Sequence, residues 1–195
     1  MICWEWDPHW CVGVGPALAN AAAAAGVEGW AALVGVVSDV SIRRYHPDDA
    51  EAVWALHVAA LGDAGGYDEA FADLDADLER VVEEYLGTDG EFVVAEQGAE
   101  IVAMGGFQPD GDDPDAAVVR RMRVAPDRQR EGLGSRVLAE LESRAREAGF
   151  ERLTLDTSTD MDAAMRFYED HGYEEFDRER VAEADTTLVF YEKEL

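Results

Sequence analysis

The chain has 195 residues, and its 43 acidic residues against 16 basic ones give a formal net charge of −27 at pH 7. This balance argues against nucleic acid as a partner, because phosphate backbones are held by Lys and Arg that displace counterions. Hydrophobic residues make up 48% of the chain, so its length and composition fit one domain with a single core.

Residues 1–39 differ in composition from the rest of the chain. They contain no Lys or Arg, a run of five Ala at 21–25, and three Trp at positions 4, 6 and 10. The apolar stretch 12–37 is interrupted by Pro16 and Glu28, so we expect neither a signal peptide nor an integral membrane span. We expect an extension over 1–39 and a folded domain over 40–195. A tail that binds a partner or a membrane surface, and a true start near Val40, are the alternatives.

The two cysteines, Cys3 and Cys11, both lie in this extension. They cannot build a disulfide framework for the domain, which favours a reducing, cytoplasmic setting. His9 lies between them, but the spacing matches neither a CxxC pair nor a usual zinc pattern. We therefore expect no metal site.

From Val40 onward the sequence has a regular pattern of elements. A short strand is expected over 40–43, and Pro47 with two following Asp residues begins a helix. After a glycine-rich break at 62–66, apolar residues at helical spacing predict a second helix over Ala70–Leu86. The domain thus opens with a strand and two helices.

The second part of the domain alternates strands and helices. A hairpin over 91–96 and 100–107 turns around Gln97 and Gly98. The pattern then predicts a strand over 117–124, a helix over 132–148 closed by Gly149, a strand over 152–156, a helix over 160–170, and strands over 173–180 and 187–193.

The segment from Val118 to Ser135 is typical of a phosphate-binding strand, loop and helix. Gly132 and Gly134 allow close approach to the backbone, and the first N–H groups of a helix are free donors at its positive end. Arg128 and Arg130 add positive charge. The Walker pattern GxxxxGK[ST] and the dinucleotide fingerprint GxGxxG are both absent. The segment therefore predicts a pyrophosphate site of a different kind.

Residues 129–134, Gln-Arg-Glu-Gly-Leu-Gly, resemble the Q/R-x-x-G-x-G/A motif of the GNAT superfamily of N-acetyltransferases. The order of elements over 40–195 is similar as well. The resemblance implies an α/β (α+β) fold with a central mixed, mostly antiparallel sheet of about seven strands flanked by about four helices. It also implies acetyl-CoA as cosubstrate, bound by Met122, Arg123, Val124, Gln129, Arg130, Glu131, Gly132, Leu133, Gly134 and Ser135.

A second segment, Ala164–Tyr173, looks like the A-x-x-x-Y-x-x-x-G-[FY] pattern of the same superfamily. The resemblance implies that Tyr168 protonates the departing thiolate. A phenol with an ordinary pKa of about 10 keeps its proton at neutral pH and can donate it. The alternative is that Tyr168 only packs beside Phe167 with its hydroxyl at the surface.

Two positions depart from the superfamily pattern. Val118 stands where many relatives carry a Glu that acts as a base through water, and Met161 stands where many carry an Asn that helps to hold CoA. We expect acetyl transfer to a primary amine on a small molecule or peptide, by direct attack in a ternary complex and with no assigned base. A non-catalytic acyl-CoA-binding module is the alternative function, and a homodimer stays open as an assembly.

The basic residues are unevenly divided, because fifteen are Arg and Lys193 is the single Lys. An acidic, lysine-poor composition resembles that of proteins from salt-accumulating halophiles, where salt screens the repulsion between carboxylates. This origin predicts weak stability in dilute buffer. An ordinary acidic protein from a GC-rich genome is the alternative.

Overall fold

The computed structural model describes residues 40–63, 75–182 and 185–195. The predicted extension over 1–39 lies outside the described residues, and so does the beginning of the helix expected from Ala70. The strands are β1 (Val40–Arg44), β2 (Glu91–Gln97), β3 (Glu100–Pro109), β4 (Ala116–Val124), β5 (Arg152–Ser158), β6 (Glu174–Val181) and β7 (Thr186–Glu194). The α-helices are α1 (Ala50–Asp63), α2 (Ala76–Glu79), α3 (Leu133–Ala148) and α4 (Asp162–Asp170).

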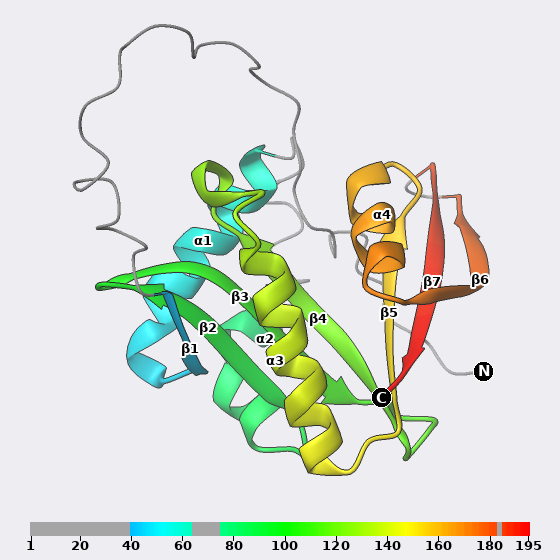
Figure 1. Cartoon of the computed structure of the whole chain (residues 1–195), viewed down its shortest axis with the longest axis horizontal. Helices are drawn as coiled ribbons and strands as arrows, with labels where there is room; N and C mark the ends of the chain where they lie inside the picture. The colour runs from blue at the N-terminus through cyan, green and yellow to red at the C-terminus, as the bar shows by residue number, and fades with distance from the viewer. Residues whose placement is uncertain (1–39, 64–74, 183–184) are drawn as a thin grey trace, which may run out of the picture.

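The strands form one seven-stranded mixed sheet in the order β1-β2-β3-β4-β5-β7-β6 (Figure 1). Neighbouring strands are antiparallel except for β4 and β5, which are parallel. A parallel pair needs a crossover connection, and α3 supplies it. The mixed, mostly antiparallel sheet with flanking helices confirms the fold class expected from the sequence.

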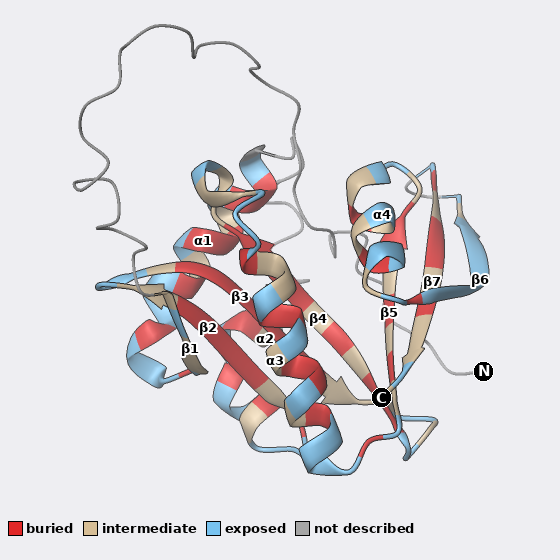
Figure 2. Ribbon diagram, viewed as in Figure 1, coloured by how far each residue is buried: buried red, intermediate tan, exposed pale blue. Residues whose placement is uncertain are grey.

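Each face of the sheet carries its own hydrophobic core. Helices α3 and α4 cover one face, where Val137, Leu138 and Leu141 of α3 are fully buried against the middle strands (Figures 1 and 2). These residues follow the helical spacing that predicted α3. On the other face, α1 and α2 pack over a second cluster that includes Val53 and Tyr85. We call these the α3 face and the α1 face.

The prediction of one continuous helix over Ala70–Leu86 is wrong in its described part. Helix α2 ends at Glu79, Arg80 leaves the helical conformation with φ −126°, and a π-helical turn follows over Val82–Leu86. The Tyr85 hydroxyl donates to Asp77 at 2.5 Å. Residues eight apart in a straight helix are separated by about 12 Å along its axis. The break therefore brings this pair together.

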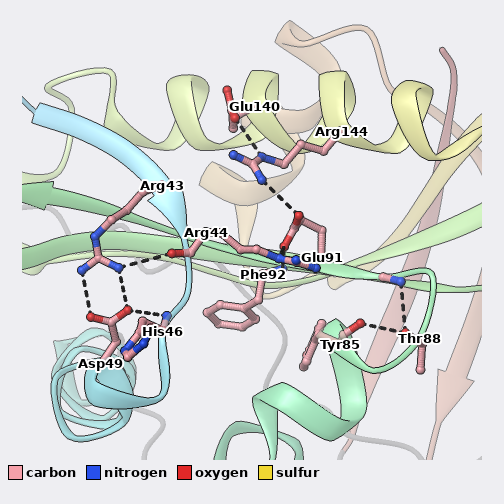
Figure 3. Close-up of polar contacts among 11 residues, drawn as sticks. Arg43, Arg44, His46, Asp49, Tyr85, Thr88, Glu91, Phe92, Glu140 and Arg144 are labelled. Atoms are coloured by element: carbon pink, nitrogen blue, oxygen red, sulfur yellow. Dashed lines mark hydrogen bonds and ion pairs between the residues drawn. The ribbon is translucent and has the colours of Figure 1, made fainter.

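The edge strand β1 is tied to its neighbours by ion pairs (Figure 3). Arg43 donates to both carboxylate oxygens of Asp49, at 2.7 and 2.8 Å, just before α1 begins. This pairing holds the pKa of Asp49 below its ordinary value. Glu91 of β2 accepts from Arg44 of β1 at 2.8 Å and from Arg144 of α3 at 3.0 Å. These contacts fix both α3 and the start of α1 against the sheet.

Candidate functional site

The sheet opens between β4 and β5. The parallel pairing of these strands covers three residue pairs and ends at Val118 and Thr154, although both strands continue to Val124 and Ser158. Beyond the last pair the two strands diverge (Figure 1). Beyond this point the facing edges of β4 and β5 do not pair with each other as strands. An extended ligand can pair with edges of this kind, as an added strand does.

A β-bulge lies in the part of β4 beyond its last pair with β5. Arg120 pairs with Gly106 and Arg123 with Met104, so Arg121 and Met122 together face Gly105 alone. The extra residue shifts the alternation of side chains. As a result Val119 and Met122, three residues apart, both pack into the core of the α3 face.

Glycine at position 105 leaves room for this arrangement. A Cβ there would lie 2.5 Å from the Met122 Sδ atom and 3.1 Å from Leu141. The bulge therefore holds Met122 with its side chain on the α3 face and its backbone at the opening. Met122 and Val124, predicted to bind acetyl-CoA, both lie on the diverging part of β4.

The predicted phosphate loop leads directly from β4 into α3. Gly132 precedes the first helical residue and has φ +81°, a left-handed conformation that glycine adopts without steric cost. Arg130 also has a positive φ, of 64°. The first bond of the helix runs from the Arg136 N–H to the Gly132 carbonyl at 3.1 Å. The preceding N–H groups at the start of α3 have no earlier turn to bond to, as an anion site requires.

Side chains of the loop divide between internal contacts and unsatisfied groups. Arg128 donates to the Glu131 carboxylate at 2.9 Å and also to Gln97. The Glu131 carboxylate offsets the charge of Arg128, and the contact with Gln97 directs its side chain toward the end of β2. The side-chain nitrogen of Gln129 is buried without a hydrogen-bond partner among the described residues. Gln129 thus retains a donor close to the start of α3.

Tyr168 lies on α4 and is 3% exposed. Its ring packs against Phe167, Tyr173 and Tyr191, with centroid distances of 5.2, 5.7 and 6.4 Å. Burial and the neighbouring carboxylate of Glu169 raise the pKa of Tyr191 to about 12. Because Tyr168 is buried among these rings, its own ring is fixed and does not lie at the surface. Its catalytic role stays a prediction.

A histidine that the sequence did not single out joins α4 to the phosphate loop. His171 Nδ1 lies 2.6 Å from the Phe167 carbonyl oxygen, and Nε2 lies 2.8 Å from the Ser135 hydroxyl. A carbonyl only accepts, so Nδ1 carries a hydrogen, and in the neutral ring Nε2 accepts from Ser135. This contact holds the segment that carries Tyr168 against the start of α3. The two residues are 36 positions apart, so no local pattern predicted their contact.

On the α1 face, a chain of polar groups, all buried except the half-buried Asp77, reaches β4. His57 Nε2 lies 2.9 Å from Asp75 Oδ2, and Arg121 donates to Asp75 Oδ1 at 2.5 Å. Arg121 also donates through Nε and Nη2 to Asp77, at 3.0 and 2.6 Å, and Tyr85 closes the chain on Asp77. We call these five residues the Arg121 network.

Burial and pairing set the protonation of the network. Burial lowers the pKa of His57, and the contact with Asp75 opposes this only in part. Burial alone would raise the pKa of Asp75, but His57 and Arg121 outweigh it, so the pKa of Asp75 is lowered. Burial and the charge of Asp77 raise the pKa of Tyr85 well above its usual value. His57 is therefore neutral at pH 7, while Asp75 is ionised.

The two departures from the superfamily pattern have clear places in the fold. Val118 is the last β4 residue paired with β5, so a side chain without acid or base function stands at the start of the opening. Met161 directly precedes α4. The neighbouring Asp160 accepts from the Thr186 hydroxyl at 2.7 Å and from Ser158 at 3.1 Å. Its carboxylate therefore binds Thr186, the first residue of β7.

Within residues 40–63, 75–182 and 185–195, no three His, Cys, Asp or Glu side chains gather as ligands for a metal ion. The same part of the chain has no helix that is long and apolar enough to cross a membrane. Cys3, His9 and Cys11 lie outside the described residues.

The sheet opens between two parallel strands, and beside this opening a helix begins directly after a glycine. A protein with this arrangement can bind an extended, phosphate-bearing ligand. The model of the acetyltransferase (GNAT) family matches residues 51–173. The chain therefore belongs to the acetyltransferase (GNAT) family.

Individual relatives agree with this assignment. The uncharacterized N-acetyltransferase YjgM of Escherichia coli (strain K12) is 28% identical over 111 residues, a match that spans 56% of this chain and 66% of YjgM, just under two thirds. A GNAT-family acetyltransferase of Staphylococcus aureus Mu50 superposes with a TM-score of 0.68 at 21% identity, over 80% of this chain and 99% of that one. YncA of Salmonella typhimurium, solved with its cofactor acetyl-CoA, gives 0.67 at 20%, over 80% and 94%. These two structures show that the fold is shared.

Proposed function

We propose that this protein transfers an acetyl group from acetyl-CoA to a primary amine by direct attack in a ternary complex. The observation that carries the proposal is the early end of the β4 and β5 pairing at Val118 and Thr154. This opening adjoins the start of α3, where free N–H groups favour phosphate. One elongated ligand with a pyrophosphate and an amide-bearing arm fits both features.

The donor would be held by ten residues of β4, the loop and the start of α3. Backbone groups of Met122, Arg123 and Val124 would pair with the pantetheine arm. The loop and the first turn of α3 would surround the pyrophosphate through Gln129, Arg130, Glu131, Gly132, Leu133, Gly134 and Ser135. In support of this assignment, Gly132 leaves open space where a side chain would stand, because a Cβ there would have no neighbour within 4 Å.

The chemistry requires few side chains. The lone pair of an unprotonated amine attacks the thioester carbonyl carbon, a C–N bond forms and the C–S bond breaks. Backbone donors near Met122 would stabilise the charge that develops on the carbonyl oxygen. The thiolate takes a proton from Tyr168, and the nitrogen releases its extra proton to water. No residue is assigned as a base, because Val118 lacks a titratable group.

The acceptor that we propose is a cationic small molecule or a peptide amine. The loop between β3 and β4 carries Asp110, Asp112, Asp113 and Asp115, and the whole chain has a net charge of −27. A field of this sign attracts cations and repels anionic acceptors. The negative charge favours cationic amines as a class and no single compound.

A non-catalytic acyl-CoA-binding module is the second candidate, and Val118 at the opening is the observation that favours it. Titration calorimetry with acetyl-CoA tests binding, and release of free thiol with a panel of amines tests turnover. Binding with thiol release supports the enzyme. Binding without thiol release for any amine supports the second candidate, and no binding contradicts both.

A further inference from the structure

The backbone of Arg121 adopts a conformation that its side chain disfavours. Its φ is +56°, in the left-handed region, and it is the first of the two residues that face Gly105 in the β4 bulge. In bulges of this geometry the first residue is commonly glycine, because a Cβ makes the left-handed conformation costly. Here the glycine position holds one of the largest side chains in the protein, and it is 1% exposed.

The Arg121 guanidinium is fixed from two sides. Asp77 receives hydrogen bonds from Nε and Nη2, and Asp75 receives one from Nη1. Asp75 also contacts His57 of α1, and Asp77 accepts from Tyr85. Charged, two-pronged contacts of this kind define the position of a guanidinium closely.

The network also selects the register of β4. Sliding β4 by one residue would turn Arg121 toward the α3 face, whose cluster includes Val119, Met122 and Leu141. A guanidinium buried there would lose Asp75 and Asp77, and an unpaired buried charge is strongly unfavourable. The bulge and the ion pairs therefore support each other.

We infer that Arg121 is a positioning residue of the acetyl-transfer site. Its guanidinium, held by Asp75 and Asp77 at the start of α2, keeps the β4 backbone in the left-handed bulge that presents Met122 at the opening. Arg123 also stabilises this part of the β4 backbone, because its guanidinium donates to the Met122 carbonyl at 2.9 Å. This inference rests on the proposed function, since it assumes that Met122 contributes to transfer.

Two substitutions at one position separate the backbone effect from the loss of charge. Arg121→Gly and Arg121→Ala both remove the guanidinium that Asp75 and Asp77 share, but only Gly accepts the left-handed conformation freely. We expect both variants to turn over more slowly than the wild type. The kcat of Arg121→Gly should exceed that of Arg121→Ala by about tenfold, with KM for acetyl-CoA differing by less than about threefold.

If either variant fails to fold, the same pair is made together with Asp75→Asn and Asp77→Asn, which removes the unpaired charges. Equal kcat values for the Gly and Ala variants, or a difference that appears only in KM, would overturn the inference. Thiol release by the wild type tests the proposed function separately. If the wild type shows none, crystal structures of the two variants still decide whether the guanidinium holds the bulge: a bulge kept unchanged in Arg121→Ala overturns that role, and a bulge lost in it supports it.

Discussion

The two faces of the sheet contribute to the opening in different ways. On the α3 face most of the relevant groups belong to the backbone, at the start of α3 and along the edges of β4 and β5, and the Tyr168 hydroxyl is the exception. On the α1 face they are buried side chains that bear charge or titrate, joined in the Arg121 network. Backbone donors need only the right fold, whereas buried charges need all their partners. The α3 face should therefore tolerate substitution better than the α1 face.

The strongest test of this contrast is Asp75→Ala. Removing the carboxylate leaves Arg121 and His57 buried without it, so we expect the free energy of unfolding to fall by about 3–5 kcal/mol. Urea denaturation measures the change. The control is Asp112→Ala, an exposed carboxylate whose loss should change stability by less than about 0.5 kcal/mol. Equal losses of stability in the two variants would show that Asp75 contributes no more to stability than an exposed carboxylate does.

Tyr168→Phe tests a single hydroxyl on the α3 face. The aromatic ring stays in its cluster, so stability and acetyl-CoA affinity should be kept while kcat falls about 100-fold. Thiol-release assays measure kcat, titration calorimetry measures acetyl-CoA affinity, and urea denaturation measures stability. Tyr191→Phe is the matched control, because it removes the hydroxyl that donates to Glu169 at 3.2 Å without touching the proposed acid. An unchanged kcat in Tyr168→Phe would rule out its role as the acid.

Gly132→Ala tests the backbone at the start of α3. A Cβ at φ +81° costs about 1 kcal/mol, and the shifted loop should bind acetyl-CoA about fivefold to tenfold more weakly. Gly98→Ala is the control, because Gly98 has φ +67° and similarly open surroundings in the β2–β3 turn. Both variants should lose similar stability, and only Gly132→Ala should lose affinity. Equal acetyl-CoA affinities for Gly132→Ala and Gly98→Ala would contradict a role for the loop in binding the donor.

The Arg121 network should also make stability depend on pH. Because the pKa of His57 is lowered in the fold, the unfolded chain takes up its proton first as the pH falls through the ordinary value of 6.5. The contribution of His57 is complete above that value and is lost at lower pH. Thermal melts between pH 7.5 and 5.5 should show a falling midpoint, and His57→Gln should flatten the profile. Parallel profiles for both proteins would contradict this assignment.

Salt should act on the surface more than on either buried face. With a net charge of −27, molar KCl should raise the midpoint of thermal unfolding by about a few degrees relative to dilute buffer. Sucrose, a non-ionic stabiliser, is the control for effects other than charge screening. A midpoint that does not change with KCl would count against a halophilic adaptation.

Local sequence patterns predicted the α3 face well. The boundaries of α3 follow from apolar spacing and from Gly132 and Gly149, which flank it in left-handed conformations. The strands follow from alternation and turn residues, and β4 and β5 differ from expectation by one or two residues at one end. All of these signals lie within a few positions of the structure that they specify.

The α1 face could not be predicted in the same way, because its contacts join distant parts of the chain. Arg121 lies 46 and 44 positions from Asp75 and Asp77, and each residue alone looks like one more surface charge in an acidic sequence. The apolar spacing through Leu78 and Tyr85 also gave no warning of the break at Arg80. In a chain with 43 acidic residues, composition does not distinguish the few buried carboxylates from the many exposed ones.

The short pairing of β4 with β5 also has a mechanical consequence. Strands β1 to β4 form one antiparallel block, β5, β7 and β6 form another, and only three residue pairs of the sheet ladder join them. A ligand arm that bonded to both edges would lengthen this joint and turn two blocks into one continuous sheet. Occupation of the opening would then increase the stiffness of the sheet, because the ligand would join the two blocks along a longer edge.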